Sequence, residues 1–485
     1  MNNIPVKKSF VHAVGVLVAG AAGSQILTVI AAPLLTRLFT PNSFGLMAVY
    51  AGILSIFTVI ASLRYELAIP IPADDSEAAE VVVLGLLILL AVSLLSGLIL
   101  FSTGDSLSLL LGAPQLVEYL WLLPFGVLTA GSYQVLNSWI IRKKDFHVVA
   151  TSRVTQVIGT TLVQIAGFKL GALALIGGQA VGQGLGGLQL GMRALKQLNL
   201  RSIKISRLKV VAQRYRHFPL YSTWAGLFNS LGSQLPTLML AASFGAVAAG
   251  IYALAQRVLT LPMSIVGGAI GSVLLADAAE AYRSRRIAAI VARVHEKLTN
   301  VAMPPAFILL ISGPAIFELV FGHQWREAGT LARWMAPWLY VVFVTSPLSM
   351  LFEVMEKQRQ HLIFHAVLLV VRASAIAAGA LTENLEITIA LFSIGSACCW
   401  IWMLLWINSI LENRWTVLCK STGKSMAWAL VCSAPLLAEK MSTEKIFSWY
   451  WFFGLSVAFS FAYYALVMRR TLSSANIEVL PVEKN

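Results

Sequence analysis

The chain has 485 residues, of which 58% are hydrophobic and only 12% are charged, and its formal net charge is +14. Soluble domains carry about 25% charged residues, so this composition excludes a water-soluble enzyme. It also argues against a nucleic-acid-binding protein, because the lysines and arginines flank long apolar runs and form no surface patch. The sequence therefore predicts an all-α integral membrane protein.

Fourteen apolar runs are candidates for membrane-spanning helices, because a bilayer core about 30 Å thick needs about 20 apolar residues of helix. They are residues 10–35, 44–69, 81–101, 116–141, 148–168, 170–195, 218–244, 250–275, 298–321, 330–352, 362–381, 385–410, 425–438 and 446–468. The first run is too long for a cleaved signal peptide, so we expect it to remain in the mature chain. The thirteenth run is shorter than a full span.

Lysine and arginine are concentrated in every second loop. If the N-terminus is inside, 26 of them lie in inside segments and five lie in outside loops. Such an excess is typical of cytoplasmic loops. Without the thirteenth span Arg469 and Arg470 would lie outside, so the charge bias supports that span. We expect both termini to be cytoplasmic.

A basic polar segment follows the sixth span and divides the chain. The predicted domains are an N-terminal lobe (1–195), a basic cytoplasmic linker (196–217), a C-terminal lobe (218–410), and two last spans with a cytoplasmic tail (411–485). We interpret the linker as a solvated loop, with recognition of lipid headgroups or nucleic acid as the weaker alternative. Residues 282–298 have apolar residues at helical spacing and predict an amphipathic helix in the membrane interface.

Five arginines fall within the predicted spans: Arg64, Arg153, Arg257, Arg333 and Arg372. Each costs ~2.5–3.5 kcal/mol at a bilayer centre, so each needs a partner, a cavity or a route to the headgroups. All five aspartates lie in loops or at helix ends, which makes the predicted interior cationic. A guanidinium binds phosphate in a bidentate manner and keeps its charge when desolvated. We therefore expect a ladder of arginines that binds an anionic, diphosphate-bearing substrate.

Alternatives remain for each arginine. Those near helix ends can extend to the lipid headgroups, and Arg372, the best functional candidate, can be paired with a carboxylate inside the protein. Glycines at GxxxG spacing in the sixth span, Gly178, Gly182 and Gly186, are typical of closely packed helices, and a moving hinge is the weaker interpretation.

Motifs of catalysis and metal binding are absent from the sequence. It has no nucleophile triad, Walker loop or HExxH motif, and its four cysteines lack the spacing of metal ligands. We expect a protein that is not an enzyme, with no catalytic residue, no metal and no cofactor.

Three short motifs resemble those of bacterial polysaccharide-unit flippases of the Wzx type, within the multidrug/oligosaccharidyl-lipid/polysaccharide exporter superfamily. They are residues 34–41 (LLTRLFTP), 61–69 (ASLRYELAI) and 250–257 (GIYALAQR). The resemblance implies two six-helix lobes in a V plus two C-terminal helices, in the bacterial inner membrane. It also implies transport of a polyprenyl-diphosphate-linked oligosaccharide from the inner to the outer leaflet, through a cationic cavity that contains Arg64 and Arg257. Membrane lipids and the polysaccharide polymerase machinery are the further partners implied.

Three other functions stay open. A lipid II flippase would share the cationic cavity. A drug antiporter of the same superfamily would need a carboxylate at membrane depth, which the predicted spans lack. A membrane polysaccharide polymerase would need a large outer loop with catalytic groups, whereas the longest outer loop, 102–115, has one acid and no base.

Overall fold

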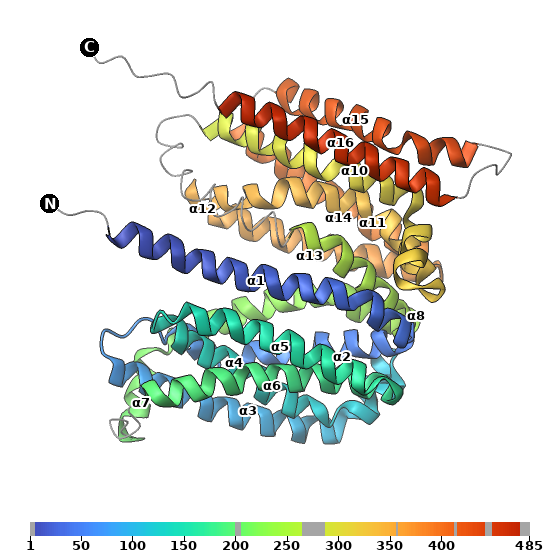
Figure 1. The fold of residues 1–485 in the computed structure, drawn as a ribbon. Coiled ribbons are helices and arrows are strands. Elements are labelled where there is room, and N and C mark those ends of the chain that lie inside the picture. The colour runs from blue at the N-terminus through green and yellow to red at the C-terminus, as the bar shows by residue number, and fades with distance from the viewer. Residues whose placement is uncertain are drawn as a thin grey trace, which may run out of the picture. The chain divides into compact units, whose positions relative to one another are not determined.

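The computed structural model describes residues 5–198, 205–263, 287–355, 357–411, 415–441 and 449–475, and these residues are helical with no strand among them (Figure 1). The chain divides into two compact units. One comprises Met1–Leu254 and Val320–Trp325, and the other comprises Ala255–Leu319 and Arg326–Asn485.

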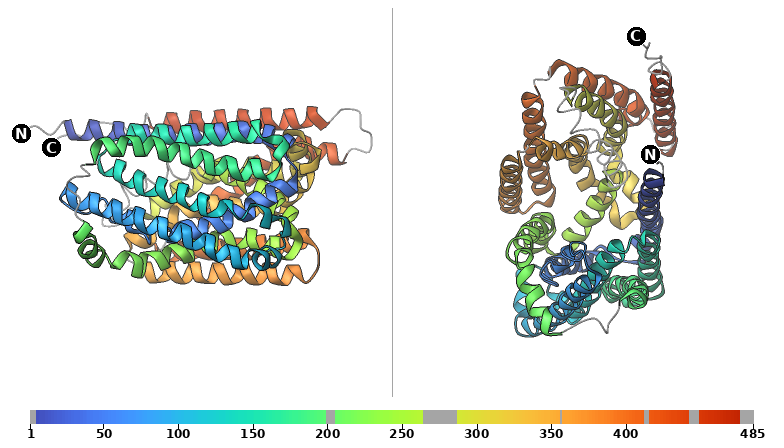
Figure 2. Two further views of the ribbon diagram at one scale, coloured as in Figure 1. Left: turned by 90° about the horizontal axis from the view of Figure 1, so that it is seen from below. Right: turned by 90° about the vertical axis from the view of Figure 1, so that its left-hand side faces the viewer.

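The first unit is a bundle of long helices that run side by side (Figure 2). Its helices are α1 (Pro5–Leu38), α2 (Pro41–Ile60), α3 (Asp75–Leu110), α4 (Leu122–Arg142), α5 (Phe146–Ala166), α6 (Ala172–Gln197), the short α7 (Ile205–Arg214) and most of α8 (Thr223–Pro262). Helix α8 is interrupted at Gly245, whose φ of 84° and ψ of 174° favour glycine. The seventh and eighth predicted spans are thus the two helical parts of α8, and residues 264–275 of the eighth lie outside the described residues.

The second unit contains the remaining long helices. They are α10 (Ile287–Phe321), α11 (Arg326–Thr345), the one-turn α12 (Leu351–Val354), α13 (Gln358–Ala380), α14 (Leu385–Ile410), α15 (Trp415–Met441) and α16 (Trp449–Ala475). Helix α15 has 27 residues, about 40 Å at 1.5 Å per residue, so the thirteenth span is longer than its apolar run suggested.

Each of the fourteen predicted spans corresponds to one long helical segment when α8 is counted as two. By length and apolar composition alone, eight helices of the described residues can cross a membrane. Helices α4, α5, α6, α11 and α15 are not among these eight, and the first three carry glutamines that line a polar cavity. The prediction of an all-α protein with about fourteen membrane helices is confirmed.

Two predictions about polar segments are wrong in the described residues. Residues 287–298 are not a separate interfacial helix but the first turns of α10, which is bent at Ser312, and their apolar side chains pack inside the second unit. Residues 282–286 lie outside the described residues. The linker is not only a solvated loop, because its residues 205–214 form α7, whose Leu208 and Val211 are buried.

Helix α7 packs on the start of α3 through ion pairs. Arg214 lies 2.8 Å from a carboxylate oxygen of Glu77, and Arg207 lies 3.7 Å from the fully buried Glu80. Tyr215 donates a hydrogen bond of 3.0 Å to Glu77. Burial of the Tyr215 side chain is the larger cause of its raised pKa, and the Glu77 carboxylate is the second cause. Glu77 and Glu80 thus attach α7 to the bundle through ion pairs. Glu80 is a buried carboxylate that was not predicted from the sequence.

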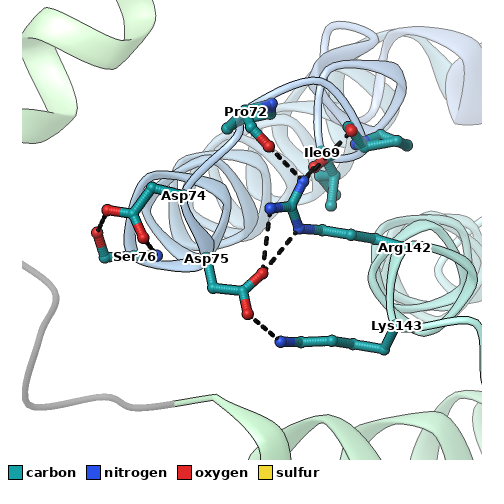
Figure 3. A network of polar contacts seen from close by, with 8 residues as sticks. Ile69, Pro72, Asp74, Asp75, Ser76, Arg142 and Lys143 are labelled. Atoms are coloured by element: carbon teal, nitrogen blue, oxygen red, sulfur yellow. Dashed lines mark hydrogen bonds and ion pairs between the residues drawn. The ribbon is translucent and has the colours of Figure 1, made fainter.

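A second network fixes the loop between α2 and α3 (Figure 3). Arg142, the last residue of α4, donates to the carbonyl oxygens of Ile69, Pro70 and Pro72 at 3.3, 3.3 and 2.7 Å, and its Nη2 lies 3.1 Å from Asp75. Lys143 lies 2.5 Å from the other oxygen of Asp75. One arginine thus uses several donors to hold a loop that follows directly after the segment containing Arg64.

The glycines of α6 lie against α5. A Cβ atom at Gly182 would lie 1.9 Å from the Thr160 hydroxyl oxygen and 2.5 Å from the Gln156 carbonyl oxygen. A Cβ atom at Gly178 would lie 2.7 Å from Gln164. The interpretation of this glycine stripe as a close helix contact is confirmed, because no larger residue fits between the two backbones.

Candidate functional site

The first unit contains a polar cavity of about 410 Å³ between α2, α4, α5, α6 and the first part of α8. Most of its lining residues carry amide, hydroxyl or guanidinium groups. The polar ones are Ser55, Thr58, Arg64, Tyr133, Gln134, Gln156, Gln179, Gln183, Asn229, Ser230 and Ser233. Arg64 is the single charged side chain among the described residues that line it. The volume falls within the range of about 300–1,000 Å³ that is common for ligand sites.

Arg64 lies at a break after α2 and not within a helix. Helix α2 ends at Ile60, and Leu63 and Arg64 have φ angles of 49° and 63°, before a short 3-10 helix, Tyr65–Leu67. The predicted helical span 44–69 is therefore wrong after Ile60. The apolar run continues to Ile69 because Ala68 and Ile69 are buried in the bundle core, so apolar composition did not mark the end of the helix.

The left-handed conformation of two consecutive non-glycine residues is costly. The left-handed conformation costs roughly 1–2 kcal/mol for each residue. Such conformations persist where the surrounding structure imposes them, often at functional sites. Here the turn directs Arg64 into the cavity, where a continued helix would have placed it on a helix face.

The guanidinium of Arg64 has one weak ion pair. Its Nη1 lies 3.4 Å from a carboxylate oxygen of Glu66, and the side chains of Arg64 and Glu66 are 24% and 5% exposed. Ser62 donates a hydrogen bond to the other oxygen of Glu66. The Nε of Arg64 is buried and has no hydrogen-bond partner among the described residues. A guanidinium has five N–H donors, and the contact with Glu66 occupies one of them.

Gly226 of α8 brings the backbone of that helix against Arg64. A Cβ atom at position 226 would lie 2.3 Å from Nη2, 2.7 Å from Nε and 2.9 Å from Cζ of Arg64. Only a glycine therefore permits the observed position of the guanidinium. Gly226 was not a candidate from the sequence, because nothing in the local sequence links it to residue 64.

The glutamines of the cavity were also largely missed. Gln179 and Gln183 are four residues apart and so share one face of α6, and Gln156 of α5 and Gln134 of α4 complete the lining. The side-chain oxygens of Gln134 and Gln183 are buried without a hydrogen-bond partner in the part of the chain that is described. A polar pair spaced four residues apart in a predicted span is the signal that could have indicated them.

The other predicted arginines lie elsewhere. Arg153 is half-buried on α5 and is not among the cavity-lining residues. Arg257, Arg333 and Arg372 belong to the second unit. Arg257 is exposed on α8, and Arg333 is half-buried on α11 beside Gly313 of α10. The ladder across both lobes stays a prediction.

Arg372 is held within the second unit. Its Nε donates a hydrogen bond of 3.2 Å to Ser396 of α14. Its guanidinium carbon lies 5.3 Å from the ring centre of Trp338 and 5.6 Å from that of Phe392. Cation–π contacts of this kind stabilise a desolvated guanidinium, so aromatic packing is a local reason for a charge at this depth.

Metal ligation is not supported by the described residues, in which no group of three or more His, Cys, Asp or Glu side chains converges. The site contains hydrogen-bond donors and acceptors, one cation and no nucleophile–base pair among its described lining residues. It can therefore bind a polar anionic molecule, and nothing in its lining points to bond cleavage.

A bundle of long apolar helices with a polar, arginine-containing cavity is typical of the class of multi-pass membrane transporters. The sequence model of the family described as "Polysaccharide biosynthesis protein" matches residues 34–330, and the chain belongs to this family. A curated relative is the succinoglycan biosynthesis transport protein ExoT of Rhizobium meliloti (strain 1021), 24% identical over 333 residues. That match covers 66% of this chain and 64% of ExoT, which is less than two thirds of its length.

Solved structures show the same fold. The lipid II flippase MurJ in an inward closed conformation aligns with a TM-score of 0.71 at 13% identity, covering 94% of this chain and 99% of that one. An inward-facing multidrug resistance MATE family transporter of the MOP superfamily aligns with a TM-score of 0.58 at 17% identity, covering 87% and 97%. The fold of the exporter superfamily, expected from the sequence motifs, is confirmed.

Proposed function

We propose that this protein is a flippase that moves a polyprenyl-diphosphate-linked oligosaccharide repeat unit, of an O-antigen, capsule or exopolysaccharide, from the inner to the outer leaflet. The observation that carries the proposal is Arg64, which lines a polar cavity, has one ion pair of 3.4 Å with Glu66, and meets no carboxylate among the described lining residues. A guanidinium in this setting suits a diphosphate, which it can bind in a bidentate manner. Membership in the polysaccharide biosynthesis protein family supports the class of cargo.

Transport follows by alternating access, in which the cavity is open to one side of the membrane at a time. In related folds two repeats move relative to each other around a fixed site. Arg64 binds the diphosphate, and Arg153, Arg257, Arg333 and Arg372 complete the cationic route across the membrane. The protein works in the bacterial inner membrane with both termini in the cytoplasm, next to the polymerase that consumes the flipped units.

Lipid II is the second candidate cargo, because it is also a diphosphate-linked glycan and because the fold aligns with MurJ over nearly the whole chain. The chemistry at Arg64 does not distinguish the two substrates. Export of cationic drugs is disfavoured, since the only charge lining the described cavity is positive.

The test is deletion of the gene in its host, with two measurements on the same cells. One is the amount of surface polysaccharide, and the other is the sidedness of its lipid-linked precursor. The proposal predicts loss of polysaccharide with the precursor held on the cytoplasmic face. Precursor that reaches the outer face but stays as single units would indicate a polymerase, and an unchanged glycan with arrested cell-wall synthesis would indicate a lipid II flippase.

A further inference from the structure

The cavity presents an unusual surplus of side-chain amides. Four glutamines from three helices line it: Gln134 of α4, Gln156 of α5, and Gln179 and Gln183 of α6. Each amide offers two donor hydrogens and one acceptor oxygen. In a membrane bundle such groups normally hydrogen-bond to a neighbouring helix. Gln164 does so, since its Nε2 donates a 3.0 Å hydrogen bond to the Leu175 carbonyl.

The cavity glutamines leave acceptors unsatisfied. The oxygens of Gln134 and Gln183 are buried without a partner among the described residues. A buried acceptor without a donor costs roughly 1–3 kcal/mol, and a group of this kind needs an explanation. A diphosphate cannot supply the missing donor because it is itself an acceptor. A ligand that brings hydroxyl groups can supply the donor once these amides turn toward the cavity.

A sugar satisfies both requirements. Its hydroxyls donate to the glutamine oxygens and accept from the amide nitrogens, while the diphosphate to which it is attached lies at Arg64. A sugar that carries a carboxylate would compete with the diphosphate, because Arg64 is the one cation among the described lining residues. The lining thus favours an uncharged sugar.

We propose that Gln134, Gln156, Gln179 and Gln183 form a sugar subsite that binds the neutral sugar attached directly to the diphosphate. This inference rests on the proposed function and adds the part of the substrate that the cavity recognises. A cavity of about 410 Å³ is within the range that holds a small polar ligand such as a diphosphate with one sugar.

The experiment compares two probes on the full-length protein in detergent. One is a polyprenyl diphosphate, and the other is the same lipid with a single neutral sugar, tested with glucose, galactose and N-acetylglucosamine. The variant is Gln156→Met/Gln183→Met, because methionine has a similar length, is a good helix former and offers no comparable hydrogen bond. Two lost hydrogen bonds predict about a tenfold or greater rise in Kd for the preferred sugar-bearing probe and about no change for the bare diphosphate.

Two further variants are matched controls. Gln189→Met changes an amide of α6 outside the cavity lining, whose Nε2 donates to Thr151 and whose oxygen is also unpaired. We expect it to change neither Kd. Arg64→Gln should raise the Kd of both probes by a similar factor, because it acts on the diphosphate. Thermal unfolding in the same detergent confirms that each variant is folded.

Each outcome has one meaning. The sugar subsite would be overturned if the wild-type protein bound the bare polyprenyl diphosphate as tightly as each of the three sugar-bearing lipids. It would also be overturned if the double variant changed the Kd of both kinds of probe equally. Either result leaves the proposed function intact. If Arg64→Gln changes neither Kd while the double variant still removes sugar discrimination, the diphosphate site at Arg64 is wrong and the sugar subsite stands. If the wild-type protein binds neither probe, both proposals fall.

Discussion

Arg64 shows how a single residue defines the candidate site. Its charge could be placed near the membrane from the sequence, but its environment depends on a left-handed turn, on Glu66 two residues away and on Gly226 of a distant helix. Arg64 has one ion pair, with Glu66, at a distance of 3.4 Å. A diphosphate can compete with Glu66 for the guanidinium. A ligand therefore meets a guanidinium that is positioned but not saturated.

Gly226→Ala tests the position of the guanidinium without changing a charged or polar residue. The added Cβ would overlap Nη2 of Arg64, which is the end of a flexible side chain, so the guanidinium should move while the backbone stays. We expect affinity for polyprenyl diphosphate to fall by roughly ten- to a hundredfold, the equivalent of one charged hydrogen bond. Titration of the lipid into the purified variant measures this.

Gly177→Ala is the matched control for this experiment. Gly177 lies on α6 of the same unit, and a Cβ atom there meets nothing within 4 Å. Unchanged affinity in Gly226→Ala, with the control also unchanged, would contradict the described position of Arg64.

Substitution of Arg372 should affect both transport and stability, because aromatic rings and Ser396 contact its guanidinium. Arg372→Ala should impair transport, and Arg372→Lys should retain part of it, since lysine keeps the charge but not the planar stacking geometry. Loss of the cation–π contacts should also destabilise the protein by about 0.5–2 kcal/mol. Transport is compared at equal amounts of inserted protein, with thermal unfolding measured alongside.

Normal transport by a stably inserted Arg372→Ala protein would exclude Arg372 from the proposed cationic route. Its contacts with Ser396 and the aromatic rings would then have a structural role.

At the scale of helices, apolar composition predicted the presence of each helix better than the residues at which it begins and ends. All fourteen spans correspond to helical segments, because a bilayer leaves few alternatives for an apolar run of 20 residues. The predicted end of the second span was wrong because apolar residues after Ile60, such as Ala68 and Ile69, are buried in the bundle core although the helix has ended. The start of α10 was misread because Ile287, Val291 and Leu298 face protein, and a sequence cannot distinguish a protein contact from a lipid contact.

The candidate site was less predictable than the fold. Arg64 was found because a charge is conspicuous in an apolar run, whereas the glutamines that share its cavity are uncharged and lie on three helices. Only the packing of α4, α5 and α6 brings these side chains together. Gly226 likewise has meaning only through a contact between residues 162 positions apart in the chain.

The contact between α5 and α6 predicts a stability effect. In Gly182→Ala the new methyl group would overlap Thr160 and the backbone of Gln156, so the two helices must separate. We expect a loss of about 1–3 kcal/mol, the usual cost of overpacking. Thermal unfolding in detergent measures it, and Gly177→Ala should instead be neutral or slightly stabilising. A Gly182→Ala protein as stable as wild type would show that α5 and α6 are not this close.

The loop network of Figure 3 predicts an order of effects. Arg142→Ala removes the donor to three backbone carbonyls and to Asp75, whereas Asp75→Asn removes the exposed carboxylate that pairs with Arg142 and Lys143. Exposed ion pairs contribute about 0–1 kcal/mol, so Arg142→Ala should destabilise the protein more than Asp75→Asn. Unfolding of both variants under identical conditions checks this, and the reverse order would contradict the described network.

At the scale of the whole molecule, family and fold are established by similarity to known proteins, and the cargo is our proposal. The chain belongs to the polysaccharide biosynthesis protein family and has the fold of superfamily exporters. The relatives named are transporters and not enzymes. The proposed function requires that a diphosphate-linked glycan crosses the membrane and that Arg64 is needed for this transport.

The most direct measurement is transport by the purified full-length protein in liposomes. A polyprenyl-diphosphate-linked glycan in the starting leaflet is followed to the opposite leaflet with an impermeant sugar-modifying reagent, for wild type, Arg64→Gln and the Gly177→Ala control. We predict flipping by wild type and the control, and at least about a tenfold slower rate for Arg64→Gln, because the charged contact to the diphosphate is lost. Equal rates for wild type and Arg64→Gln, or no flipping by any of the proteins, would contradict the account.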